Sequence, residues 1–267
     1  MAADAPISQA RPTTPRWALA IETSGPAGAV ALGPIEPNNP AMPRMFELPD
    51  KKRHNLELMP TVDAAARDLG LTPDGLTEVY VSLGPGSFTG VRAGVACAQM
   101  LGLADGDAPG AVLVGVPTAD VLASPAGPGQ WAAVVMSIKR GTAWCGLWRD
   151  GDWALPCADR PTNEFAQVAA ERVKEDPGDA PAWWIVERSS AESSAESSAE
   201  ADALACPPGF ELCDPAWRTP SAARLFGIGR DRALAGHTTP PERLLPEYGR
   251  APEAVRLWDA KAASGKA

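Results

Sequence analysis

The sequence predicts an α/β protein of two halves, each built on its own mixed β-sheet. The first observation is a strand–turn–strand pattern over residues 17–32, which gives way to a helical stretch within 53–69. The second is that strand-like apolar runs and a helical run return between 119 and 217. The third is the length of 267 residues, which suits two domains or one large one. Because hairpins alternate with helices, one all-parallel sheet is not expected.

The first half contains two helical stretches among its strands. The helix within 53–69 carries apolar residues at helical spacing, including Leu56, Met59 and Val62. Residues 76–84 (LTEVYVSLG) have the pattern of a buried strand. The motif GPGSFTG follows and opens a second helical run, after which AVLVGVPT predicts another strand.

The second half repeats this mixture of elements. Apolar runs predict strands over 131–139, 142–148 and 182–187, and NEFAQVAAERV (163–173) predicts a helix. A last helix is expected over 220–231. These runs favour a second α/β unit over a continuation of the first sheet.

Five segments are expected along the chain. The first 15 residues contain three prolines and little to bury, and a perfect SSAE repeat has the composition of a solvated loop. The expected segments are a disordered tail over 1–15, an N-terminal half over 16–118, a second half over 119–219 with the SSAE loop at 189–200, a C-terminal helix and closing segment over 220–254, and a tail over 255–267.

Composition limits the function classes. The chain carries 24 basic and 33 acidic side chains, for a formal net charge of −9. Phosphate affinity comes from clustered Lys and Arg, so this balance argues against a stand-alone nucleic-acid binder. The five cysteines form no CxxC pair, which argues against a disulfide framework and a zinc cluster. With no apolar signal segment and no run long enough to cross a membrane, we expect a cytoplasmic protein.

Common catalytic signatures are absent from the sequence. With only His54 and His237 present, there is no HExxH metal motif. Ser87 has Pro85 and Thr89 at the positions where a GxSxG elbow needs glycines. No GxxxxGK[ST] phosphate loop occurs either. We therefore predict no catalytic residue and no metal site.

A stripe of small residues runs along the helix that follows GPGSFTG. Every fourth residue is small, at Gly90, Gly94, Ala98 and Gly102, and these positions share one helix face. Since glycine costs about 1 kcal/mol per helix position relative to alanine, the stripe indicates a close backbone approach. Two alternatives stay open: the stripe packs on the sheet, or it receives a partner helix.

Two turns resemble loops that bind phosphate. The turn ETSGPAG (22–28) joins two strands, and a hairpin of this kind cradles phosphate in kinase-like ATPases. The exposed N-terminus of the GPGSFTG helix could hold an anion. The alternative is that both are structural turns. The candidate residues of a vestigial nucleotide or anion loop are Glu22, Thr23, Ser24, Gly84, Gly86 and Ser87.

Several segments together resemble one family. WALAIETSGPAGAVAL, KKRHNLELMPTVDAAARDLGL, GPGSFTGVRAGVACAQMLGLA and PEYGRAPEA are similar to motifs of the TsaB (YeaZ) family in the glycoprotease-like superfamily. The resemblance is strong over 17–118, weak in the middle, and returns over 220–254.

The resemblance implies a tandem actin-like ATPase (ASKHA) fold of two ribonuclease-H-like halves. It also implies an accessory subunit that activates a TsaD-type catalytic subunit, recruits a TsaE-type ATPase, and contacts tRNA only indirectly during threonylcarbamoyladenosine synthesis next to the anticodon. A homodimer is the alternative when the partner is absent. The implied partner-interface residues are His54, Leu58, Thr61, Val62, Ala65, Arg92, Ala93, Ala96 and Met100.

Departures from the family pattern argue against independent catalysis. Glu22 replaces the family Asp, while Ser137 and Thr142 stand where the family has acidic residues. With few carboxylates, a magnesium–nucleotide would have few ligands, so we expect no cofactor of its own beyond a weak or interface-shared nucleotide. The alternatives are a stand-alone ASKHA-type ATPase or phosphotransferase, and a glycoprotease-like peptidase that uses His54 and Ser87.

Overall fold

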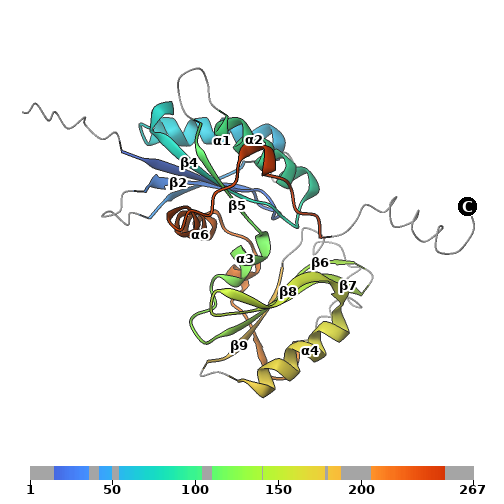
Figure 1. The fold of residues 1–267 in the computed structure, drawn as a ribbon. Helices are drawn as coiled ribbons and strands as arrows, with labels where there is room; N and C mark the ends of the chain where they lie inside the picture. The colour runs from blue at the N-terminus through green and yellow to red at the C-terminus, as the bar shows by residue number, and fades with distance from the viewer. Residues whose placement is uncertain are drawn as a thin grey trace, which may run out of the picture.

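A computed structural model shows two five-stranded sheets with helices on their faces (Figure 1). Among the described residues, no helix combines the length and apolar character that a membrane crossing requires. The side chains of residues 54, 55 and 137–139 are not described. The backbone is described for residues 15–35, 42–49, 54–103, 110–139, 141–177, 180–187 and 206–249.

The first sheet has the strand order β3-β2-β1-β4-β5. Strands β1, β2 and β3 pair antiparallel, whereas β4 lies parallel to β1 and β5 parallel to β4. This arrangement is a mixed sheet, as predicted. Its strands are β1 (Trp17–Glu22), β2 (Ala29–Pro34), β3 (Arg44–Glu47), β4 (Leu76–Ser82) and β5 (Val112–Val116).

Helices cover both faces of the first sheet. α1 (His54–Asp68) and α2 (Phe88–Gly102) pack on one face, in a core that includes Ile21. α6 (Ala222–Leu234) packs on the other face, in a core that includes Ala20. Because successive strand residues point to opposite faces, the apolar run of β1 serves both cores.

The second sheet repeats the same connectivity. Its order is β10-β9-β6-β7-β8; β6, β7 and β8 pair antiparallel, and β9 and β10 add parallel neighbours on the other side. Each half therefore places its first strand in the middle and its third and fifth strands at the edges. The strands are β6 (Trp131–Lys139), β7 (Thr142–Arg149), β8 (Asp152–Pro161), β9 (Ala182–Val186) and β10 (Phe210–Leu212).

The second sheet also carries a helix on each face. α4 (Thr162–Glu175) packs on one face, and the short α3 (Thr118–Ala123) packs on the other, with the 3-10 helix η3 (Pro215–Arg218) beside it. Asp120 of α3 links the halves: its Oδ1 accepts a 2.8 Å hydrogen bond from Trp153 Nε1 of β8, and its Oδ2 pairs with Arg232 of α6.

A closing strap, residues 237–249, runs from the end of α6 along the edge of the first sheet. The amide of Thr239 donates to the carbonyl of Leu113 in β5 (2.8 Å), and a 3-10 helix η4 (Pro241–Arg243) follows. Leu244 is buried in the core shared by α1 and α2. The strap therefore completes the first half from the C-terminal end of the chain.

The main elements agree with the sequence predictions. The two mixed sheets are confirmed, α1 occupies the predicted 53–69 region, and α6 extends the helix expected over 220–231. Strands β8 and β10 were not predicted. The expected segment boundaries remain predictions. The tail over 1–15 apart from Pro15, the 189–200 loop and the 255–267 tail lie outside the described residues.

Candidate functional site

The GPGSFTG loop joins β4 to α2 and packs on the β1–β2 turn. The Oγ of Ser87 caps α2 by accepting a 3.3 Å hydrogen bond from the amide of Gly90, and the amide of Ser87 donates to the carbonyl of Ser24 (2.7 Å). Gly84 has φ +100°, and a Cβ on Gly86 would lie 2.4 Å from the carbonyl oxygen of Ser24. Both glycines are therefore required by local geometry.

Glu22 lies at the end of β1 in a buried polar cluster, in which its Oε2 has no hydrogen-bond partner in the part of the chain that the structure describes. Its Oε1 accepts hydrogen bonds from the amide of Ser24 (2.8 Å), the Oγ of Ser24 (2.5 Å) and the Oγ of Ser82 (2.9 Å). Burial raises the pKa of the Glu22 carboxyl, and the hydrogen bonds and the charge of Arg224 oppose that rise. The three donors hold the β1–β2 turn and the end of β4 together.

A nucleotide with its metal ion is the group that an actin-like ATPase fold implies at this turn. Thr23, Ser24 and Glu22 are buried, and their side chains already bond within the chain; Thr23 Oγ1, for instance, donates to the carbonyl of Gly90 (2.7 Å). Within the described part, no group of three His, Cys, Asp or Glu side chains could hold a metal ion. The residues present do not fit a metal–nucleotide complex. Ser137 lies outside the described side chains, and Thr142 begins β7.

The small-residue stripe of α2 faces the first sheet. A Cβ on Gly94 would lie 2.6 Å from Thr23 Oγ1 and 3.3 Å from Ile21 Cγ2. One on Gly102 would lie 2.6 Å from Leu113 Cδ1. Gly90 and Ala98 are buried as well. Of the two alternatives, sheet packing explains the stripe, and the expectation of a close crossing by a partner helix at these positions is wrong.

The interface residues expected on α1 need a correction. Leu58, Val62 and Ala65 are buried in the core between α1 and the first sheet, so their side chains cannot meet a partner on this surface. Thr61 is half-buried and donates to the carbonyl of Glu57 (2.7 Å). His54 begins the helix, and its side chain lies outside the description.

The residues expected on α2 lie on its outer side. Arg92, Ala96 and Met100 are exposed, and Ala93 is half-buried. Met100 is 71% exposed. The guanidinium of Arg92 lies 4.7 Å from the centre of the Phe88 ring.

Three apolar residues on this surface were missed as interface candidates. Leu56 is 58%, Met59 51% and Phe88 60% exposed, values that are high for large apolar side chains. Met59 Sδ lies 3.2 Å from Cys97 Sγ, which joins the surface of α1 to α2. Leu56 and Met59 belong to the apolar series at helical spacing in the sequence, but the structure places both side chains on the exposed side of α1. We call the following set the α1–α2 face: Leu56, Met59, Phe88, Arg92, Ala96 and Met100.

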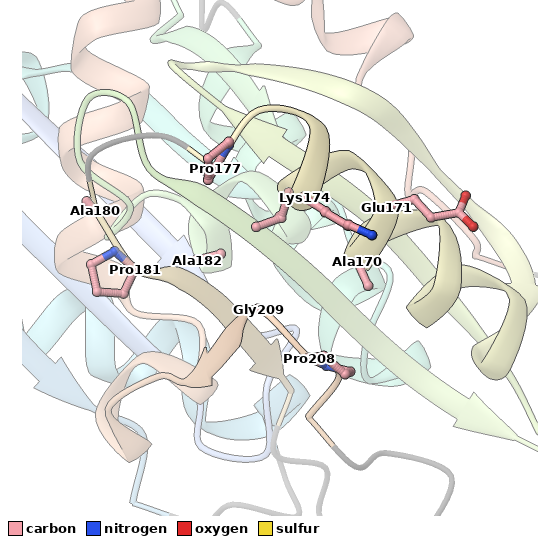
Figure 2. Close-up of a pocket in the computed structure, with 10 residues that line it drawn as sticks. Ala170, Glu171, Lys174, Pro177, Ala180, Pro181, Ala182, Pro208 and Gly209 are labelled. Carbon is pink, nitrogen blue, oxygen red and sulfur yellow. The ribbon is translucent and has the colours of Figure 1, made fainter.

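A pocket of about 450 Å³ lies elsewhere, in the second half (Figure 2). It lies between the end of α4 and the loop before β10, with Pro177, Pro181 and Pro208 in its wall and Lys174 beside it. None of the predicted site residues lines it, and α4 lies on the opposite side of the molecule from α1 and α2 in Figure 1. The pocket is therefore not part of the candidate site.

Comparisons with known proteins agree with this architecture. A family model described as TsaD, tRNA N6-adenosine threonylcarbamoyltransferase, matches residues 49–137. The tRNA threonylcarbamoyladenosine biosynthesis protein TsaB of Bacillus subtilis is 26% identical over 215 residues, 78% of this chain and 84% of that protein. An uncharacterized protein of Mycobacterium tuberculosis is 34% identical over 165 residues, 61% of this chain and 68% of that protein. The structure of YeaZ from Pseudomonas aeruginosa superposes with a TM-score of 0.61 at 20% identity, over 87% of this chain and 99% of that one.

The repeated mixed sheets, together with the GPGSFTG loop that opens α2, define a protein of the glycoprotease-like superfamily with tandem ribonuclease-H-like halves. Within that superfamily the sequence relatives narrow the assignment. The chain belongs to the TsaB (YeaZ) family.

Proposed function

We propose that this chain is an accessory subunit in tRNA threonylcarbamoyladenosine synthesis, which binds and activates a TsaD-type catalytic subunit through its α1–α2 face. The observation that carries the proposal is the exposure of Met59 and Met100, with Leu56 and Phe88, on one helical layer. Exposed apolar clusters of this kind mark protein–protein contacts. The name of the Bacillus subtilis relative supports the pathway.

The family-model match supports a helix-on-helix pairing. The model is named for TsaD, and the matched residues 49–137 contain both α1 and α2. A partner that carries two helices equivalent to α1 and α2 can pack them against the α1–α2 face. The two proteins would then be related by a pseudo-twofold axis, as in an isologous interface. In the absence of that partner, two copies of this chain would pair in the same way.

The proposal assigns tRNA contact and chemistry to other subunits. A net charge of −9 disfavours direct binding to a phosphate backbone. Burial raises the pKa of the Cys97 thiol to about 11, so this thiol is protonated and a poor nucleophile near neutral pH. A TsaE-type ATPase is expected to join the pair and to supply nucleotide hydrolysis.

Purified chain mixed with the TsaD-type subunit of the same organism should elute as a stable 1:1 complex in size-exclusion chromatography with light scattering. Met59→Asp and Met100→Asp should each weaken the Kd about tenfold or more, because a charge would be buried at the contact. Leu212→Asp is the matched control, since Leu212 is exposed on β10 of the other sheet.

The activity measurement uses threonylcarbamoyladenosine formation on tRNA, followed by mass spectrometry of the nucleosides. The catalytic subunit with its ATPase should modify tRNA only when this chain is added, and the two charge variants should lower the yield. Absence of a complex, or full modification without this chain, would refute the proposed function.

A further inference from the structure

The closing strap brings an aromatic side chain to the N-terminal end of α2. Tyr248 lies against Phe88 with ring centroids 5.7 Å apart and an interplanar angle of 35°. Both rings remain open to solvent, since Phe88 is 60% and Tyr248 48% exposed. Arg92 completes the group from one turn further along α2, where its guanidinium covers the Phe88 ring.

Several hydrogen bonds hold the strap against α2 and the end of β4. The side-chain amide of Gln99 on α2 donates to the carbonyls of Pro241 and Leu244, each at 3.0 Å. The amide of Glu247 donates to the carbonyl of Leu83 at 2.6 Å. Tyr248 is therefore positioned before any partner arrives, which lowers the entropy that binding must overcome.

The strap also touches the second half. A Cβ on Gly249 would lie 3.2 Å from Pro85 Cβ and 3.4 Å from Trp144 Cβ. Pro85 belongs to the GPGSFTG loop and Trp144 to β7. The residue after Tyr248 is thus wedged between the two halves, and this contact limits how far the ring can move.

We propose that Phe88, Arg92 and Tyr248 form a preformed aromatic anchor, which the catalytic subunit grips with an apolar helix face that carries a carboxylate for Arg92. The inference rests on the proposed function and deepens it by adding the strap to the interface. Aromatic and Arg side chains dominate the affinity of protein interfaces when a partner shields them from water. The anchor is continuous with the α1–α2 face through Phe88 and Arg92.

The positive charge of Arg92 indicates which kind of partner fits the aromatic anchor. Arg92 is exposed and makes no ion pair among the described residues, so a carboxylate on the partner would complement it. A second copy of this chain fits less well, because a twofold contact centred on the anchor would bring two Arg92 guanidinium groups together. RNA could also stack on such a platform, but the net charge of −9 opposes it.

The test measures the Kd of the full-length chain for the purified catalytic subunit by calorimetry. Tyr248→Ala and Arg92→Ala should each weaken binding by about 10- to 100-fold, and added salt should weaken the wild-type complex more than the Arg92→Ala complex. Leu212→Ala, an exposed apolar residue on β10, is the matched control and should leave the Kd unchanged. Melting temperatures confirm that each variant is folded.

The outcomes separate this inference from the proposed function. If wild type binds and both variants bind within about twofold of it, the anchor is refuted while the proposed function stands. If wild type does not bind the catalytic subunit, both are refuted. Tight, salt-sensitive tRNA binding by wild type that Tyr248→Ala abolishes would overturn the assignment to a protein partner. A homodimer that Tyr248→Ala dissociates, with unchanged binding to the catalytic subunit, would do the same.

Discussion

The two halves share one strand order but are packed by opposite means. On the first sheet, glycines let helices approach closely: α2 does so at Gly94, and α6 at Gly229, where a Cβ would lie 2.2 Å from the Tyr80 ring. On the second sheet, large rings fill the space, as where Phe165 of α4 stacks on Trp184 with centroids 5.6 Å apart. A larger side chain at a helix glycine should therefore destabilise the first half, whereas truncation of a buried ring should destabilise the second half.

Removal of a ring from the second half should have the largest effect. Trp184 is buried between Phe165 and Phe210, each with its ring centroid 5.6 Å away. Trp184→Ala leaves a cavity and should lower the free energy of unfolding by about 3–5 kcal/mol, measured by urea denaturation followed by circular dichroism. Leu212→Ala, exposed on the neighbouring strand, should change it by less than about 0.5 kcal/mol. A loss below about 1 kcal/mol for Trp184→Ala would contradict the conclusion that large buried rings stabilise the second half.

Addition of atoms to the first half should have an intermediate effect. Gly94→Leu forces a side chain against Thr23 and Ile21 and should cost about 1–3 kcal/mol of stability. Ala96→Leu, on the exposed side of the same helix, should leave stability within about 0.5 kcal/mol of wild type. Thermal melts of both variants provide the measurement. Equal melting temperatures would mean that α2 can move away from the sheet, and the account of the stripe would be wrong.

Substitution of Glu22 in the polar cluster of the first half should have the smallest effect, and it should appear as a change in the pH dependence of stability. Burial raises the pKa of Glu22 above its ordinary value of 4.5, so the folded chain holds this proton more tightly than the unfolded chain. The contribution of Glu22 to stability is present below the unfolded pKa and is lost as pH rises through the folded pKa.

Glu22→Gln should therefore flatten the decline in unfolding free energy that wild type shows as pH rises above about 4.5. Urea denaturation at several pH values measures this slope. Glu211→Gln, at an exposed position on β10, is the matched control. Parallel pH curves for wild type and Glu22→Gln would show that Glu22 stays ionised in the folded chain.

The sequence predicted the element types better than the orientation of α1. Periodicity indicates that a helix has an apolar side, but α1 is apolar on two sides, so the period does not decide which one is buried. Leu58 and Ala65 lie inside, whereas Leu56 and Met59 lie outside. Which apolar side of α1 is buried depends on the position of the sheet, and the periodicity of the helix does not contain that information.

Long-range contacts in the site could not be predicted from local patterns. Glu22 and Ser82 are 60 residues apart, and the strap brings Tyr248 to Phe88 from the other end of the chain. Strand β8 was missed because Pro156 and Pro161 interrupt its pattern, and both prolines are tolerated because β8 is an edge strand. The motif GPGSFTG marked the right loop, although its glycines serve internal packing.

The return of α6 and the strap to the first sheet makes the first half discontinuous in sequence, with the second half inserted into it. During translation, the face of the first sheet that includes Ala20 and Tyr80 stays uncovered until α6 leaves the ribosome. A fragment that ends at residue 118 would expose that face and should aggregate. The excised second half, by contrast, has its own contiguous core around Trp184 and is the better candidate for independent expression.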